Sequence, residues 1–166
     1  MKQNIYGLLL AVSFLLAAFQ SYGNRPPGTV RAKENGKVVY VDKNPITHFD
    51  WYAFLWFCQH EDSLSREEIF LLLPDTNRYK TLEDFSKIRF DERKDTPVIG
   101  LNDSQKLKFA QWRTLFVNKN LAEKKKHPTF FQYTVISAEE YRALCEQNRK
   151  LKRRENEAAV LRCIVR

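Results

Sequence analysis

Hydrophobic and polar positions follow two different periods along the chain, and together these predict a mixture of helices and short strands. Apolar residues recur at helical spacing in some segments, whereas others alternate between apolar and polar residues, as half-buried strands do. Pro74 ends one of the helical segments. The predicted helices are 47–62, 63–73, 107–119 and 137–148, and the predicted strands are 37–41, 130–136 and 158–166.

Three of these helices are preceded by residues that favour a helix start. Thr47 stands three residues before Asp50, Asn102 three before Gln105, and Ser137 three before Glu140. In such a capping box each side chain bonds the backbone N–H of the other residue. The spacing therefore predicts helices that begin after Thr47, Asn102 and Ser137.

The first of these helices is rich in aromatic residues. Phe49, Tyr52 and Trp56 recur near helical spacing, and Trp51 lies among them. Aromatic rings contribute most to core packing, so we interpret the segment as a largely buried helix rather than as a ligand-binding box.

Residues 95–116 predict a corner between a strand and a helix. Pro97 begins a short apolar strand, Gly100 turns the chain, and Phe109 and Trp112 lie on one stripe of the helix that follows. We expect both rings to be buried and Arg113 to find a carboxylate or carbonyl partner. Further apolar residues broaden the stripe, so the helix is expected to lie against structure on both sides; these are Leu107, Ala110, Leu115 and Phe116.

The amino terminus has the pattern of a secretory signal peptide. Lys2 precedes an apolar run from Leu8 to Phe19, and the small residues Ser21 and Gly23 suit positions −3 and −1 of a cleavage site. The alternative is a membrane anchor, but the run is shorter than the roughly 20 residues that span a bilayer. Residues 1–23 are thus predicted to direct export, to the periplasm or the cell exterior.

The remaining chain, 24–166, is long enough for a single domain with its own core. The full chain has a formal net charge of +8, and removing residues 1–23 takes away Lys2 and no acidic residue. In an exported protein, basic charge favours acidic protein surfaces, glycans or lipid headgroups over nucleic acid as the counter-charge. We therefore expect another envelope or secreted protein as partner, no nucleic acid, and no transmembrane span after cleavage. A charged segment at about 148–157 is typical of a solvated helix end or a linker.

The cysteines leave two alternatives open. Three cysteines in an oxidising compartment allow one disulfide and a free thiol, or three reduced, buried thiols. No pair has the spacing of a zinc site, and the histidines are scattered. The residues concerned are Cys58, Cys145, Cys163, His48, His60 and His127.

Several short motifs, in this order, resemble the formylglycine-generating-enzyme, or sulfatase-modifying-factor, family. The opening strand and aromatic helix are similar to the start of that family's domain, the 97–113 corner to its central motif, "YTVISAEEYRAL" to its next helix, and "VLRCIVR" to its closing strand. The residues that carry the resemblance are Asp42, Ile46, Thr47, Trp51, Phe54, Leu55, Trp56, Pro97, Gly100, Gln105, Phe109, Trp112, Arg113, Tyr133, Ser137, Glu140, Tyr141, Arg162 and Cys163.

The resemblance implies an α+β fold of the C-type-lectin-like kind, here shortened, with about three main helices and short strands. It also implies that the catalytic segment is missing. In the family, a long segment before the closing strand carries the cysteine pair that binds copper, with calcium sites nearby. Here about 18 residues, nearly half of them charged, join Leu144 to Arg162. We therefore assign no catalytic, cofactor-binding or metal-binding residue, and Cys163 corresponds to a structural position.

A non-enzymatic role follows as the favoured hypothesis, because a fold carries no activity when its site is absent. Family relatives without catalytic cysteines include lipoproteins of gliding and protein-secretion machinery. The resemblance thus implies a binding or scaffold module at the cell envelope. Two alternatives remain: formylglycine-generating activity on sulfatases, and a degenerate, truncated paralogue.

Overall fold

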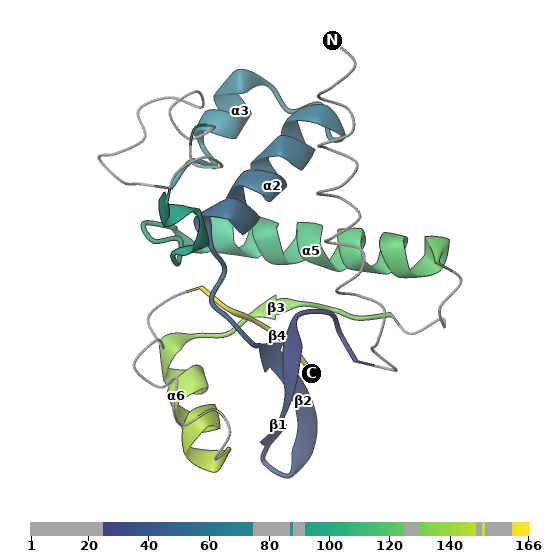
Figure 1. Ribbon diagram of the computed structural model, residues 1–166, viewed down its shortest axis with the longest axis vertical. Helices are drawn as coiled ribbons and strands as arrows, with labels where there is room; N and C mark the ends of the chain where they lie inside the picture. The colour runs from purple at the N-terminus through teal and green to yellow at the C-terminus, as the bar shows by residue number, and fades with distance from the viewer. Residues whose placement is uncertain (1–24, 75–86, 88–91, 125–129, 149–150, 152–160) are drawn as a thin grey trace.

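The structure is a computed structural model that describes residues 25–74, 87, 92–124, 130–148, 151 and 161–166. The described chain is mixed α+β, with four helices and a small antiparallel sheet of four strands (Figure 1), which confirms the predicted class. The helices are α2 (His48–His60), α3 (Arg66–Phe70), α5 (Asp103–Glu123) and α6 (Ala138–Gln147), and η2 (Glu92–Asp95) is a 3-10 turn. The strands are β1 (Thr29–Glu34), β2 (Lys37–Asp42), β3 (Thr134–Val135) and β4 (Cys163–Val165).

The sheet joins the two ends of the described chain. Its order is β1-β2-β4-β3, and all neighbours are antiparallel. Asn35 and Gly36 connect β1 to β2 with φ angles of +49° and +81°, which suits a two-residue hairpin turn. Ile164 of β4 pairs with both β2 and β3, so the carboxyl-terminal strand lies in the middle of the sheet.

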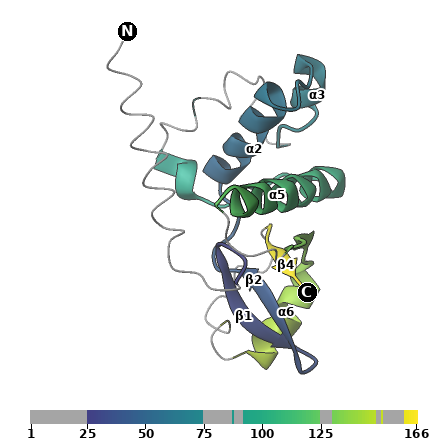
Figure 2. The ribbon, with the colours of Figure 1, turned by 90° about the vertical axis from the view of Figure 1, so that its right-hand side faces the viewer.

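Each face of the sheet supports its own core, because neighbouring side chains of a strand point to opposite faces. Val39, Val41 and Ile164 pack with α6, whereas Cys163 and Val165 belong to the larger core with α2, α3 and α5. Figures 1 and 2 show α2, α3 and α5 together above the sheet and α6 alongside its strands.

Aromatic rings build the larger core. Trp51 is fully buried, its ring stacks on that of Phe109 with centroids 5.3 Å apart, and its Nε1 donates to the carbonyl of Leu72 at 3.0 Å. Phe54 meets both rings edge-on, and Trp112 is packed against the same cluster. The prediction that Trp51 and Phe109 are core residues is confirmed, and Trp112 is partly buried.

The outer faces of α2 and α5 are more exposed than predicted. Trp56 is 47% exposed and Leu115 is 69% exposed, and Phe49, Leu107 and Phe116 are also exposed. The expectations of a largely buried α2 and of cover on both sides of α5 are therefore wrong. Apolar residues surround much of each helix, and a pattern of this kind does not reveal that only one face is packed.

All three predicted capping boxes are present, and Ser65 with Glu68 forms a fourth at the start of α3. The boxes place Thr47 and Glu140 at helix starts, as expected. The α5 helix begins at Asp103, directly after its predicted cap Asn102, and continues to Glu123, beyond the predicted end near 119.

The predicted strands are shorter than expected at three places. Of the predicted 158–166 strand, Cys163–Val165 form β4, and 158–160 lie outside the described residues. Only Thr134–Val135 of the 130–136 segment forms a strand, because Asn118 and Thr114 of α5 accept the backbone N–H groups of Phe131 and Tyr133. Of the strand that was expected to begin at Pro97, one isolated bridge to Thr47 is present.

Residues 37–41 form β2 as predicted, whereas β1 was not predicted. The signal peptide and most of the charged 148–157 segment lie outside the described residues. No helix in the described part of the chain combines the length and apolar character needed to cross a bilayer.

Candidate functional site

A buried carboxylate joins three elements at the boundary between α5 and the sheet. Asp42 ends β2 and is almost fully buried. Its Oδ2 accepts hydrogen bonds from Arg113 Nη1 and from the backbone N–H of Cys163, both at 2.7 Å. Its Oδ1 lies 2.6 Å from Arg113 Nη2. One side chain thus links β2 to the middle of α5 and to the first residue of β4.

We call the group formed by Asp42, Arg113, Tyr133, Arg162 and Cys163 the Asp42 centre. The guanidinium carbon of Arg113 lies 4.4 Å from the centroid of the Tyr133 ring, within cation–π range. Burial alone would lower the pKa of Arg113, but the neighbouring Asp42 carboxylate raises it, and the net shift is upward. Arg113 therefore stays charged inside the fold.

The loop before β1 closes one side of the centre. Tyr133 donates its hydroxyl hydrogen to the carbonyl of Pro27 at 3.2 Å, and Arg113 Nη2 reaches the same oxygen at 3.5 Å. Gly28 has a φ of +75°, and a Cβ there would lie 3.3 Å from Arg113 Nη2. Glycine therefore suits both the backbone conformation and the close approach.

A second arginine lies on the other side of Asp42. Arg162 is 1% exposed, and its Nη1 donates to the Asp42 carbonyl at 3.5 Å. Its guanidinium carbon lies 4.7 Å from the centroid of the Tyr141 ring of α6. Since Tyr141 belongs to the smaller core, Arg162 joins that core to the end of β2.

The cysteine thiols are buried and poorly placed for reaction. All three are buried and outside any disulfide, which matches the alternative of three reduced thiols. Burial and the Asp42 carboxylate raise the pKa of the Cys163 thiol to about 12, and burial and Asp62 raise that of Cys58 to about 11. Both therefore remain thiols at neutral pH, whereas the thiolate is the nucleophile and the metal ligand.

The cysteines also lie in different cores. Cys58 and Cys163 belong to the larger core, and Cys145 belongs to the core of α6. Among the described residues, no group of three or more His, Cys, Asp and Glu side chains is placed to hold a metal ion. A Cu(I) site of soft thiolate ligands does not fit these residues.

The structure brings five of the sequence-predicted site residues together: Asp42, Arg113, Tyr141, Arg162 and Cys163. The expected partner of Arg113 is confirmed as both a carboxylate and a carbonyl. The other predicted residues lie elsewhere. Thr47 and Glu140 cap helices, and Trp51, Phe109 and Trp112 pack in or against the larger core. Pro97 forms a bridge to Thr47, Gly100 turns the chain with a φ of +74°, and Trp56 is exposed.

Sequence reasoning missed two polar contacts, one at the Asp42 centre and one at the start of α5. Pro27 supplies the carbonyl that Tyr133 and Arg113 share, and its signal was the Pro-Pro-Gly run just before β1. Gln105 was noted as a cap, but its buried Nε2 also donates to the carbonyls of Leu71 and Leu73 at 3.0 and 2.8 Å. No local pattern indicates that second contact.

The Asp42 centre therefore has the chemistry of a structural contact between β2, α5 and β4. Its charges are paired or stacked on rings, and its thiol is protonated. Comparisons of the chain with protein-family models, with curated proteins and with solved structures found no match. Function is inferred from the residues and geometry described above.

Proposed function

We propose that the protein is an exported, non-catalytic binding module, built on a shortened domain of the formylglycine-generating-enzyme (C-type-lectin-like) type. The observation that carries the proposal is the Asp42 centre. The motifs that resemble the family lie far apart in the chain, with Asp42 and Arg113 separated by 71 positions and Asp42 and Cys163 by 121. That their residues meet at one buried joint supports reading them as parts of a common scaffold.

The state of the cysteines supports a non-catalytic role. Oxidation of a sulfatase cysteine on copper requires accessible thiolates as soft ligands. The thiols of Cys58 and Cys163 are buried and have raised pKa values, and Cys145 lies in the other core. The alternative of formylglycine-generating activity therefore lacks a group in the described residues that could begin the reaction.

Packing argues against the alternative of a degenerate paralogue. A chain that had lost half a core would be expected to leave its polar joint exposed or unpaired. Here Asp42 and Arg162 are almost fully buried, and aromatic rings close the larger core. Exposed aromatic residues on α2 instead favour a surface for another envelope or secreted protein, including components of gliding or secretion machinery.

The first experiment uses the protein as its own cells produce it. Cell fractionation with amino-terminal sequencing should find it outside the cytoplasm and cleaved near Gly23. The purified protein should show one cooperative unfolding transition, no labelled thiol before denaturation and three after it. Titration with Cu(I) should show no stoichiometric binding. Stoichiometric copper, together with formylglycine formation on a sulfatase peptide, would contradict the proposal.

A further inference from the structure

One face of α2 carries aromatic side chains that point away from the core. Trp51, Phe54 and Cys58 mark the buried face. On the opposite face, at intervals of three or four residues, lie Phe49, Ala53, Trp56 and His60, which we call the α2 outer stripe. Phe49 is 38% exposed, Trp56 is 47% exposed and His60 is exposed.

The rings of Trp56 and His60 are held in place before any partner arrives. Their centroids are 4.4 Å apart with an interplanar angle of 15°, so they are stacked. His60 Nδ1 lies 2.8 Å from the Trp56 carbonyl, and since a carbonyl only accepts, this nitrogen must carry the hydrogen. A rigid, exposed aromatic pair of this kind loses little side-chain entropy on binding.

Acidic residues predominate in the segment that carries the α2 outer stripe. The segment 47–74 contains five carboxylates and one basic residue, in a chain whose formal net charge is +8. All five carboxylate residues are exposed. They are Asp50, Glu61, Asp62, Glu67 and Glu68, and the basic residue is Arg66. The segment 47–74 therefore carries a net negative charge, opposite in sign to that of the whole chain, while Lys108 of α5 lies within electrostatic reach of Glu68.

We propose that the α2 outer stripe binds a cationic, amphipathic segment of a partner protein. The apolar side of such a segment covers Phe49 and Trp56, and its Lys or Arg side chains meet the exposed carboxylates of the segment 47–74. The indole of Trp56 is also the ring that attracts a cation most strongly. The acidic surroundings disfavour anionic lipid headgroups at this face. This inference rests on the proposed binding function and names the surface and the class of partner.

The test uses the full chain and a defined probe. The probe is a labelled synthetic amphipathic helix of Leu and Lys, and its control is the same pattern of Leu and Glu. Binding is measured by fluorescence anisotropy at low and high salt. We expect the Leu–Lys helix to bind, more weakly at high salt, and the Leu–Glu helix not to bind.

Variants locate the contact on the surface. Trp56→Ala should weaken binding at least about tenfold, because buried tryptophans dominate such interfaces, and Trp56→Phe should retain part of the affinity. The double variant Glu61→Lys, Asp62→Lys should also weaken it. Leu115→Ala is the matched control, since Leu115 is a highly exposed apolar residue on α5 and should leave affinity unchanged. Thermal unfolding verifies that each variant is folded.

Three results would overturn the inference. One is equal binding of the Leu–Lys and Leu–Glu helices, and another is unchanged affinity in a folded Trp56→Ala protein. The third is a dimer of the unmodified protein that Trp56→Ala converts to a monomer, which would assign the stripe to a second copy. The proposed function fails separately, through copper binding and formylglycine formation, so the two failures are distinguishable.

Discussion

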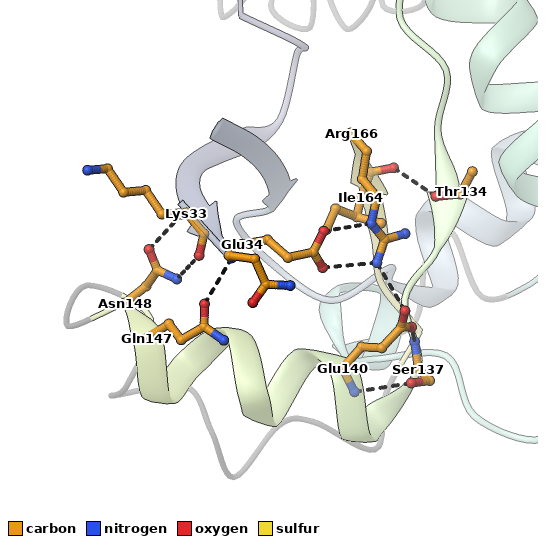
Figure 3. A network of polar contacts seen from close by, with 10 residues as sticks. Lys33, Glu34, Thr134, Ser137, Glu140, Gln147, Asn148, Ile164 and Arg166 are labelled. Atoms are coloured by element: carbon orange, nitrogen blue, oxygen red, sulfur yellow. Dashed lines mark hydrogen bonds and ion pairs between the residues drawn. The ribbon is translucent and has the colours of Figure 1, made fainter. Parts of the chain in front are cut away.

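Two arginines hold distant parts of this chain together through carboxylates, one inside the fold and one at its surface. Inside, Arg113 contacts Asp42. At the surface, Arg166 contacts Glu34 of the hairpin and Glu140 of α6 (Figure 3), and we call this group the Arg166 clamp. The contact distances are similar, at 2.6 to 2.7 Å inside and 2.9 to 3.1 Å outside.

Burial is what separates the two sites. The side chains of Arg113 and Asp42 are 14% and 2% exposed, whereas those of Arg166, Glu34 and Glu140 are 41%, 27% and 47% exposed. Water and salt screen the outer charges, so such pairs contribute little. Inside, removing one partner leaves a charge that water cannot reach. Similar geometry therefore predicts very different consequences when each contact is broken.

The largest effect is expected from breaking the inner pair. Arg113→Met should lower the free energy of unfolding by about 3–5 kcal/mol, because Asp42 then keeps a buried charge with fewer donors. Urea unfolding provides the measurement, and Arg166→Met is the matched surface control. The double variant Asp42→Asn, Arg113→Met should lose less than the sum of the single variants. An Arg113→Met protein no less stable than Arg166→Met would contradict the comparison.

A finer test adds one methyl group beside the inner pair. Gly28→Ala should cost about 1–2 kcal/mol, because alanine is strained at positive φ and its Cβ would press on Arg113 Nη2. Gly36→Ala is the matched control, since its φ is +81° and nothing lies within 4 Å of the added Cβ. The excess loss in Gly28→Ala, read from urea unfolding, measures the crowding of the centre. Equal losses would mean that Arg113 moves aside freely.

Local chemistry made much of the fold predictable. The capping boxes at Thr47, Asn102 and Ser137 require only two residues three apart, and the structure forms all of them. The Asn35–Gly36 turn is an equally local signal that we did not use, and its omission is why β1 was missed. The exposed side of α2 was not predictable, because Phe49 and Trp56 fit a core helix as well as a binding surface.

The Asp42 centre was predictable only in part. That Arg113 needs an acceptor follows from placing an arginine in an apolar helix face, since a buried cation must be paired. Which acceptor it finds depends on a strand 71 positions earlier in the chain, and no spacing rule reaches that far. Arg162 and Tyr141 likewise meet because β4 pairs with β3, the strand that leads into α6.

Near the Arg166 clamp lies a neutral contact that should contribute more to the free energy of unfolding than the clamp itself. Asn148 accepts from the Lys33 N–H and donates to the Lys33 carbonyl, both at 2.8 Å, so its amide occupies the open edge of β1 (Figure 3). Asn148→Ala should cost about 1 kcal/mol and speed hydrogen exchange at the Lys33 amide. Gln147→Ala, which loses one 3.3 Å bond, should have a smaller effect. Unchanged exchange at Lys33 would contradict this.

The smallest effect is expected at the Arg166 clamp itself. Arg166→Ala should change the free energy of unfolding by less than about 1 kcal/mol, and the difference should shrink further in high salt. Urea unfolding at two salt concentrations provides the measurement. A loss as large as that of Arg113→Met would mean that exposure does not decide the strength of these contacts.

The pH dependence of stability distinguishes the contributions of the two partners of Glu140, which are Ser137 and Arg166. The pKa of this carboxyl lies below its ordinary value of 4.5, first because it accepts the Ser137 backbone N–H in the capping box and only later because of Arg166. A carboxyl with a lowered pKa stabilises the fold at neutral pH, and this contribution is lost as the pH falls below about 4.5. The Arg166→Ala protein should therefore still lose most of this stability as the pH falls, whereas the Glu140→Gln protein should lose less, as urea unfolding at several pH values will measure. If Arg166→Ala reduces that loss as much as Glu140→Gln does, the ion pair rather than the cap holds Glu140 in its charged form.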